Sequence, residues 1–299
     1  MGFRSVYITS KADLSIKNSQ LVIAQEETVL VPMEDIAAIV LEDRRTAMTA
    51  LLLSELSEAG VAVYFCDEKH MPNSVSVPYC QHSRQAAILK LQLDASVPLK
   101  KRLWQRIVQQ KLVNQGLCLQ LLGLEGEAYL RSCAKAVQSG DATNREAVGA
   151  KYYFAKWLPN VHRRDEHPVN GALDYGYAIL RGAIARSLAA HGFHIALGLH
   201  HDSELNAMNL ADDFLEPFRP MVDVLVGTNP PAGEELTRQD RAALVAVLHQ
   251  ECQMPNGVTS VLSAIEQMTG SLAAVYRNKD AALLNLPSVL NPKGYQREE

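Results

Sequence analysis

The 299-residue sequence has no run of about 18 consecutive apolar residues, the length that a membrane-spanning helix needs. Its first ten residues, MGFRSVYITS, contain neither an apolar segment nor a small-residue cleavage site, so we expect no secretory signal and a cytoplasmic location. Cysteines are few and form no C-x-x-C pair, which argues against a disulfide framework and a thiolate zinc site. We expect all five to be reduced and buried: Cys66, Cys80, Cys118, Cys133 and Cys252.

A strong net charge is also absent. The net charge is -4, and 47% hydrophobic with 21% charged residues is typical of a globular protein with a sizeable core. The charge is unevenly distributed, however: residues 1–80 contain six basic and eleven acidic side chains, whereas residues 81–120 contain seven basic and one acidic. Such a basic segment is typical either of a phosphate-binding surface or of a solvated helix face, and charge alone does not separate the two.

Hydrophobic periodicity divides the chain into two parts. Up to about residue 80, short runs such as SVYITS and QLVIAQ predict strands, and TAMTALLLSELSEAG predicts one helix beside the sheet, ending at Gly60. From about residue 82 the apolar residues follow helical spacing. The expected fold class is α+β: a small β-rich N-terminal domain over 1–80, a linker or first helix over 81–94, a larger all-α domain over 95–285 and a flexible tail over 286–299.

Within the helical part, the segment VNGALDYGYAILRGAIARSLAAHG is rich in alanine and glycine. Small side chains let neighbouring helices approach closely, so this segment predicts a central helix. The sequence TNPPAGEE breaks the helical pattern after residue 228, and further helices are expected at roughly 236–250 and 257–285.

One stretch, LGLHHDSELNAMNLADDFLEPFRP (residues 197–220), sets two histidines ahead of three acids. If 206–219 form a helix capped by Asn206, the 100° step per residue places Asp212, Asp213 and Glu216 on one face, and Pro217 distorts the helix after Glu216. Like charges on one face repel unless a divalent cation or Arg219 neutralises them. The residues His201 and Glu216 suit such a cation, and a solvated acidic face is the alternative.

A second candidate acid lies in GDATNREAVGAKYYFAKW. The spacing of Thr143 and Glu146 matches a capping box, S/T-x-x-E, which by itself would explain the glutamate. Alternatively, Glu146 lies in the first turn of a buried, aromatic-rich helix and points toward another element.

Three of these segments, NREAVGAKYYF, VNGALDYGYAILR and LGLHHDSELNAMNLADDFLEPFRP, resemble in identity, order and spacing the family of CRISPR-associated protein 1, the spacer-acquisition integrase. The N-terminal segments VPMEDIAAIVLE and TALLLSELSEAGVAVYFCDE resemble the β-domain of that family. The resemblance covers about residues 4–225 and is greatest to members from type II systems.

The resemblance implies a homodimer that joins CRISPR-associated protein 2 and acts on double-stranded DNA with Mg²⁺ or Mn²⁺. The implied reaction is transesterification, in which a 3′-hydroxyl of captured DNA attacks a phosphodiester at the CRISPR repeat, with hydrolytic nicking as a side activity. Carried over by motif, the metal-binding and catalytic residues are Glu146, His201 and Glu216. The carboxylate of Asp213 is a fourth ligand or orients His201, and His200 is the less favoured histidine.

The basic segment gains a role if DNA is the substrate, because both DNA molecules must be held by their backbones. We expect phosphate contacts from the basic residues, with Arg219 and Tyr175 as further candidates, although core packing would equally explain Tyr175. The basic residues are Arg84, Lys100, Lys101, Arg102 and Arg106.

Two other functions fit part of the sequence. The LHHD segment matches the H…HD…D pattern of helical phosphohydrolases, with His191 or His194 upstream and Asp213 downstream, but this pattern leaves Glu146 without a role. A non-catalytic DNA-binding scaffold would bury its acids against arginines instead of a metal ion.

Overall fold

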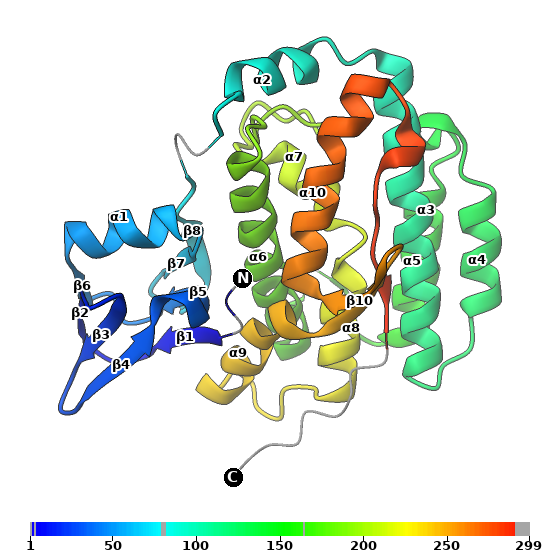
Figure 1. Ribbon diagram of the computed structural model, residues 1–299. Helices are drawn as coiled ribbons and strands as arrows, with labels where there is room; N and C mark the ends of the chain where they lie inside the picture. Colours follow the sequence, from blue (N-terminus) through cyan, green and yellow to red (C-terminus); the bar gives the residue numbers. More distant parts are fainter. Residues whose placement is uncertain (1, 3, 79–81, 164, 291–299) are drawn as a thin grey trace.

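The structure is a computed structural model that describes residues 2, 4–78, 82–163 and 165–290. A strand-rich N-terminal part is followed by a mostly helical part, which confirms the predicted fold class (Figure 1). Among the described helices, none is both long and apolar enough to cross a membrane.

In the described residues, two four-stranded sheets and one α-helix form the N-terminal part, on the left of Figure 1. In spatial order, the first sheet consists of β1 (Arg4–Ile8), β5 (Ile36–Leu41), β7 (Ala62–Cys66) and β8 (Pro72–Val75), and the second of β4 (Thr28–Pro32), β3 (Gln20–Ala24), β2 (Asp13–Lys17) and β6 (Ala47–Met48). The strands β1, β5 and β7 run parallel, as do β2 and β6, and the other neighbours are antiparallel. Helix α1 (Ala50–Glu58) is followed by Gly60 at a φ of 70°, the left-handed residue expected after a helix end.

The central strands β5 and β7 are buried on both faces, which explains their continuous apolar sequences. One face, with Ile39 and Val63, packs on the second sheet and α1. The other face packs on the helical part, where the Tyr64 hydroxyl donates a hydrogen bond to the Ile179 carbonyl at 2.8 Å. The first sheet therefore joins the two parts of the molecule.

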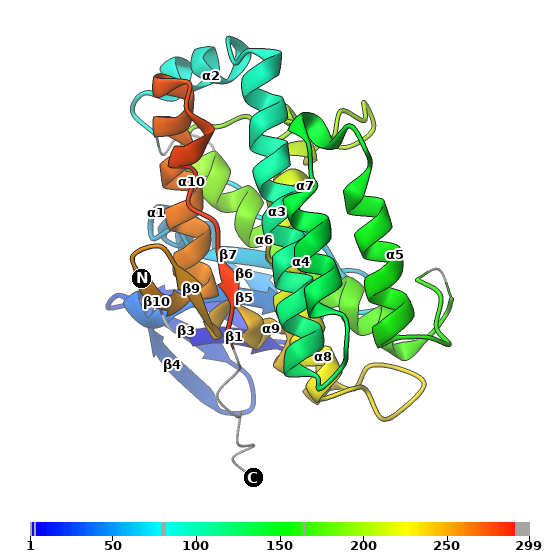
Figure 2. The ribbon, with the colours of Figure 1, turned by 90° about the vertical axis from the view of Figure 1, so that its right-hand side faces the viewer.

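The helical part is built around α6, the predicted central helix, which α10, α7 and α8 flank (Figures 1 and 2). The four cysteines in the described part of the chain are buried and free, as predicted, and Cys80 lies outside it. The helices are α2 (Gln85–Leu93), α3 (Val97–Leu121), α4 (Glu127–Lys135), α5 (Arg145–Trp157), α6 (Pro168–Ala190), α7 (Asn209–Leu215), α8 (Arg219–Thr228), α9 (Arg238–Val245) and α10 (Val261–Asn278), with 3₁₀ turns η1 (Met33–Asp35), η2 (Ser139–Asp141), η3 (Ala246–His249) and η4 (Ala281–Leu283).

The helical part differs from the all-α prediction near its C-terminal end. Strands β9 (Glu251–Met254) and β10 (Gly257–Ser260) form a hairpin, so the helix expected from residue 257 begins at Val261. Strand β11 (Ser288–Val289) pairs with β9, and the folded chain thus extends past the boundary predicted at residue 285. The remainder of the predicted tail, 291–299, lies outside the described residues.

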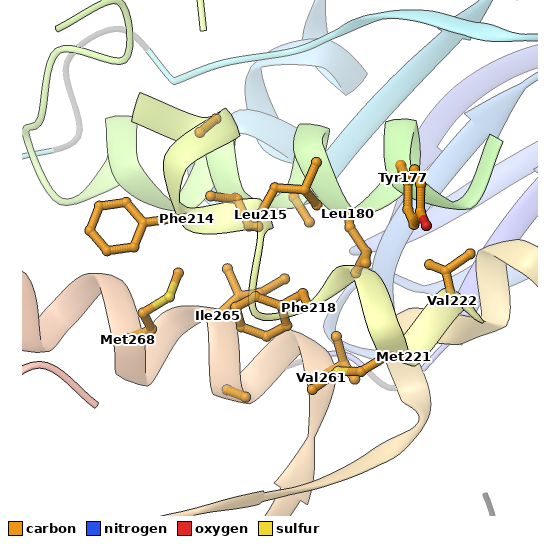
Figure 3. Close-up of a cluster of buried hydrophobic side chains, with 14 of the residues drawn as sticks. Tyr177, Leu180, Phe214, Leu215, Phe218, Met221, Val222, Val261, Ile265 and Met268 are labelled. Atoms are coloured by element: carbon orange, nitrogen blue, oxygen red, sulfur yellow. The ribbon is translucent and has the colours of Figure 1, made fainter. Parts of the chain in front are cut away.

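A cluster of apolar side chains fixes α7 and α8 against α6 and α10 (Figure 3). At Gly176 on α6, a Cβ atom would lie 2.5 Å from a methyl carbon of Val222 on α8, so the close approach of these helices requires glycine. The acids of α7 and its C-terminal end are consequently held in fixed positions. The labelled residues of the cluster are Tyr177, Leu180, Phe214, Leu215, Phe218, Met221, Val222, Val261, Ile265 and Met268.

Candidate functional site

Helix α3 provides the centre of the site. It begins at Val97 and is capped by Ser96, whose hydroxyl accepts a hydrogen bond from the Leu99 amide, with Pro98 in the first turn. Lys111, in the middle of the helix, is buried, and its ammonium lies 2.5 Å from Oε1 of Glu146 and also contacts Oε2 of Glu216. Two acids that are far apart in the sequence thus meet on one cation.

Glu146 reaches Lys111 because another residue caps its helix. The Asp141 carboxylate accepts hydrogen bonds from the amides of Arg145 (2.8 Å) and Glu146 (2.9 Å), at the start of α5. Asn144, in the left-handed region, is the N-cap residue, so the predicted capping box between Thr143 and Glu146 is wrong. The Glu146 side chain is free to leave its helix, as the alternative interpretation required.

Glu216 sits at the break between α7 and α8. The helix ends at Leu215, and Pro217 prevents its continuation, as predicted. Oε1 of Glu216 accepts a hydrogen bond from Nε of Arg219 at 3.0 Å. Burial alone would raise the pKa of Glu216, but the adjacent Arg219 and Lys111 outweigh burial and hold the pKa at about 2. Glu216 is therefore a buried, fully ionised carboxylate.

The ammonium of Lys111 is equally fixed in its charged form. Burial lowers its pKa, but the Glu216 and Glu146 carboxylates outweigh burial and raise the pKa above its usual value. Arg219 completes the group by lying over the Tyr177 ring, 4.6 Å from its centroid. The two acids and two cations compensate one another in formal charge.

His201 is held by Asp213. Its Nδ1 lies 2.8 Å from Oδ1 of Asp213, a buried carboxylate that also accepts the backbone amides of Leu199 (2.5 Å), His200 (3.3 Å) and His201 (3.1 Å). Both Asp213 oxygens are therefore engaged in hydrogen bonds, one of them with the His201 ring. This hydrogen bond raises the pKa of His201 against the effect of partial burial.

The neighbouring His200 has a different environment. Its ring stacks on Trp104 of α3, with centroids 4.2 Å apart and planes 5° from parallel. A carboxylate partner on one ring nitrogen is typical of metal-binding histidines, and His201 has one. The spacing argument for His201 over His200 thus gains a geometric reason.

The acids of the 197–220 stretch do not share one face. The predicted helix from Asn206 begins only at Asn209, and Asp212 pairs with the Arg181 guanidinium at 2.6 Å instead of facing solvent. Asp213 points to backbone amides and Glu216 to Lys111 and Arg219. Each acid has its own partner, so the predicted mutual repulsion does not arise.

The donor atoms suit a hard divalent cation, although they are not assembled around one point. Among the described residues, no three acidic, histidine or cysteine side chains lie close enough to hold a metal ion. Glu146 and Glu216 face each other across Lys111, and His201 stands apart beside Asp213. Oε2 of Glu216 is buried and is contacted by the Lys111 ammonium, so a cation already neutralises this carboxylate. Two carboxylates and an oriented imidazole fit Mg²⁺ or Mn²⁺.

The candidate DNA-binding residues are dispersed. Lys101 and Arg102 are exposed at the start of α3 and Arg84 is exposed before α2, whereas Arg106 is half-buried and donates to the Ala281 carbonyl. The 100° step places Lys100 within about 40° of Trp104 and Lys111, so Lys100 lies on the face of α3 that carries the site.

Two further candidates differ in their surroundings. Tyr175 has 0% exposure, so its predicted contact with DNA is wrong and core packing explains it. Arg219 remains a candidate, but its Nε is already bound to Glu216.

The residues of the phosphohydrolase pattern do not lie together in the structure. Nδ1 of His191 bonds the Ser187 carbonyl in its own helix turn, and Asp213 is enclosed by the 199–201 amides. His194 is exposed, with its backbone amide bonded to Gln92. These residues form no common site.

A buried acid that the sequence analysis missed lies behind the site. Asp223 on α8 accepts hydrogen bonds from the hydroxyls of Tyr153 (2.9 Å) and Tyr177. Burial raises the pKa of Asp223 to about 6, although both tyrosines lower it. A lone acid in the apolar run PMVDVLV was the available signal, because a buried charge requires partners.

The raised pKa of Asp223 predicts a pH-dependent stability. The folded protein holds this proton more tightly than the unfolded chain, so stability is lost as pH rises toward the folded pKa of about 6. Between pH 5 and 7.5, wild type should lose about 1 kcal/mol of unfolding free energy relative to Asp223→Asn. Urea unfolding at both pH values measures the difference, with the exposed Asp94→Asn as control. Parallel pH profiles for wild type and Asp223→Asn would contradict it.

The fold places the protein in a class with a strand-rich N-terminal part joined to a helical part. The helical part carries the candidate site of carboxylates and histidine. Solved structures share this fold, among them "Casposase bound to integration product" (TM-score 0.75, 15% identity, 93% of this chain and 91% of that one) and a CAS1 protein from Thermotoga maritima (TM-score 0.70, 16% identity, 92% and 97%). At these identities the likeness shows the fold alone.

Sequence comparison identifies the family. The sequence matches the family described as CRISPR associated protein Cas1 over residues 6–229. It is 45% identical over 304 aligned residues to the CRISPR-associated endonuclease Cas1 of Neisseria meningitidis serogroup C (strain 8013), covering all of both chains. A CRISPR-associated endonuclease Cas1 of Pyrobaculum aerophilum is 27% identical, covering 74% of this chain and 81% of the relative. The chain belongs to the Cas1 family, which confirms the resemblance in its motifs.

Proposed function

We propose that this protein is a divalent-metal-dependent DNA integrase and endonuclease of CRISPR adaptation. It joins the 3′-hydroxyl ends of captured DNA to the CRISPR repeat by transesterification and nicks DNA when water replaces the hydroxyl. We place the reaction in the cytoplasm, which contains both the CRISPR locus and the captured DNA.

One observation carries the proposal. Glu146 and Glu216, which belong to separate family motifs, meet on the Lys111 ammonium, and His201 is oriented by the buried Asp213. A buried carboxylate destabilises the fold unless a cation neutralises it. His201 has the carboxylate partner that is typical of a metal-binding histidine. In a Cas1 family member, this arrangement supports phosphodiester chemistry.

Within the proposed site, Glu146, Glu216 and His201 would hold the metal ion, and Asp213 engages Nδ1 of His201, which leaves Nε2 as the nitrogen for the metal. A bound Mg²⁺ or Mn²⁺ supplies charge stabilisation at the phosphate and lowers the pKa of the attacking hydroxyl. Arg219 keeps Glu216 ionised and in place. The chain therefore contributes positioning and charge, and no covalent protein intermediate is needed.

Comparisons support the same reaction class. The 45% identical relative is named an endonuclease, and solved structures with this fold include a casposase bound to an integration product and a complex titled "Crystal structure of TtCas1-DNA complex" (TM-score 0.52, 18% identity, 92% of this chain and 97% of that one). We carry double-stranded DNA over to this chain as its substrate.

The proposed assembly contains two copies of this chain and CRISPR-associated protein 2. A solved "Cas6-RT-Cas1--Cas2 complex" has a chain with this fold (TM-score 0.70, 16% identity, 96% of this chain and 36% of that one). In the N-terminal part, the edge strand β4 exposes Val29 and Leu30, and an exposed apolar edge strand suits pairing with another subunit. Light scattering of the purified protein should give the mass of a dimer, and Leu30→Lys should lower it to that of a monomer.

DNA binding should depend on the basic start of α3. A Lys100→Ala/Lys101→Ala/Arg102→Ala variant should bind a short duplex more weakly, and the slope of log affinity against log salt should fall by about 1 to 3. Fluorescence anisotropy between 50 and 200 mM salt measures the slope. Lys135→Ala, an exposed lysine at the end of α4, should leave affinity and slope unchanged. An unchanged slope in the triple variant would remove this surface from the proposal.

The function itself is tested by a joining assay. The components are the full-length protein, its partner, a short duplex and a supercoiled plasmid bearing the repeat, with Mg²⁺ or Mn²⁺. Wild type should join and nick, and His201→Ala should do neither. Equal products from both proteins would reject the proposed site.

A second candidate function is DNA binding without catalysis. It is favoured by one observation: Glu146 and Glu216 are already paired with Lys111 and Arg219, as the acids of a scaffold would be. In the same assay, a scaffold would bind the duplex but give no metal-dependent product.

A further inference from the structure

Lys111 has no place in the ligand set proposed above, yet it occupies the middle of it. Its side chain is 8% exposed, and its ammonium touches one carboxylate oxygen of each proposed glutamate ligand. Lysine is rarely buried to this extent unless it is paired. The two glutamates come from α5 and from the break after α7, so the lysine on α3 joins these two elements at the site, beside the hydrogen bond that Asn114 of α3 donates to the Pro217 carbonyl.

The charges at the site oppose the simultaneous presence of the Lys111 ammonium and a divalent metal ion. Glu146, Glu216, Lys111 and Arg219 sum to a formal charge of zero. A divalent ion between the same carboxylates would stand against the Lys111 ammonium at short range in a poorly solvated site, where like charges repel strongly. Arg219 is held in place by its contact with the Tyr177 ring and its hydrogen bond to Glu216. Lys111 has a flexible four-carbon stem, so it is the cation that moves.

We propose that Lys111 is a built-in placeholder for the divalent cation: its ammonium holds Glu146 and Glu216 together in the metal-free protein and is displaced when the metal ion binds. This inference rests on the proposed function, in which these two glutamates hold the metal. Lys111 is thus a positioning residue that sets the affinity of the site for metal. It keeps the carboxylates from repelling each other before loading and makes loading weaker than the bare carboxylate pair would allow.

The test compares Mn²⁺ binding to full-length wild type and Lys111→Met, measured by calorimetry and by the electron paramagnetic resonance signal of free Mn²⁺. Methionine matches the apolar stem of the lysine and lacks the ammonium group, so it removes the competing charge. The Kd for Mn²⁺ should fall by about tenfold or more, which corresponds to about 1.4 kcal/mol. Thermal unfolding should show a lower midpoint than wild type without metal and a larger rise on adding Mn²⁺.

Matched variants separate the possible failures. Lys135→Met, at an exposed lysine of α4, should bind Mn²⁺ as wild type does, and Lys111→Gln provides a second neutral variant if the methionine protein does not fold. Mn²⁺ affinity that is unchanged or weaker in the neutral variants, while still requiring Glu146, would overturn the placeholder role alone. Tight binding that persists in Lys111→Met/Glu146→Ala would overturn both the placeholder role and the proposed metal site.

Discussion

Glu146→Gln is expected to reduce the rate of metal-dependent nicking and joining of DNA by about 10³-fold. The reason is the loss of several kcal/mol of charge stabilisation at the phosphate. Glutamine retains the shape of the side chain but not its charge. The group of Lys111, Arg219 and Glu216 would then carry a net positive charge, which opposes a divalent cation. Because the Glu146 side chain is 30% exposed, the fold should tolerate the change.

The matched control for this prediction is Glu127→Gln. Glu127 is also 30% exposed and also paired with a cation, Arg131, but it lies on α4 away from the proposed ligands. Its replacement should leave product yield within about twofold of wild type, since an exposed ion pair contributes little. Equal losses in both variants would mean that Glu146 acts through the fold and not through the site.

Asp213→Asn is expected to lower the free energy of unfolding by about 3 kcal/mol, because a buried hydrogen-bond network would lose an acceptor. The Asp213 carboxylate accepts hydrogen bonds from three backbone amides and is paired with Nδ1 of His201. In asparagine an NH₂ group replaces one of these oxygens and cannot accept a hydrogen bond from the N–H groups around it. The same change should weaken metal affinity by about 10- to 100-fold through loss of histidine orientation. Urea unfolding and Mn²⁺ titration measure the two effects.

Asp212→Asn provides the comparison for Asp213. Asp212 is the adjacent acid on the same helix, but it is partly exposed and pairs with Arg181 at 2.6 Å. Its replacement should cost about 1 kcal/mol or less and leave Mn²⁺ affinity unchanged. Similar unfolding and binding curves for the two variants would contradict the orienting role of Asp213.

Local features of the chain were predictable from sequence. The apolar runs of β5 and β7, the small residues of α6 and the break at Pro217 each depend on neighbours within a few residues. The β9–β10 hairpin was also within reach, because Pro255 and Asn256 before Gly257 are turn residues between two short runs. Helical spacing in the following residues obscured it.

The composition of the site was less predictable, because its decisive contacts join distant segments. The family motifs indicated Glu146, His201 and Glu216, but nothing near Lys111 in the sequence indicates that it meets two of them. Similarly, Asp141 and not Thr143 caps α5, because the left-handed Asn144 turns the chain back toward Asp141. A basic segment likewise cannot reveal that Arg106 is bound to Ala281 from the far end of the chain.

The most direct test of metal-dependent transesterification at this site is the fate of a labelled duplex with either 3′-hydroxyl or 3′-deoxy ends. It is incubated with the protein, its partner and a repeat-bearing plasmid in Mn²⁺ or in chelator. We predict that wild type and His200→Ala join only the hydroxyl-ended duplex, and only with metal, whereas His201→Ala joins neither. Joining in the presence of chelator, joining of the deoxy-ended duplex, or joining by His201→Ala would contradict the account.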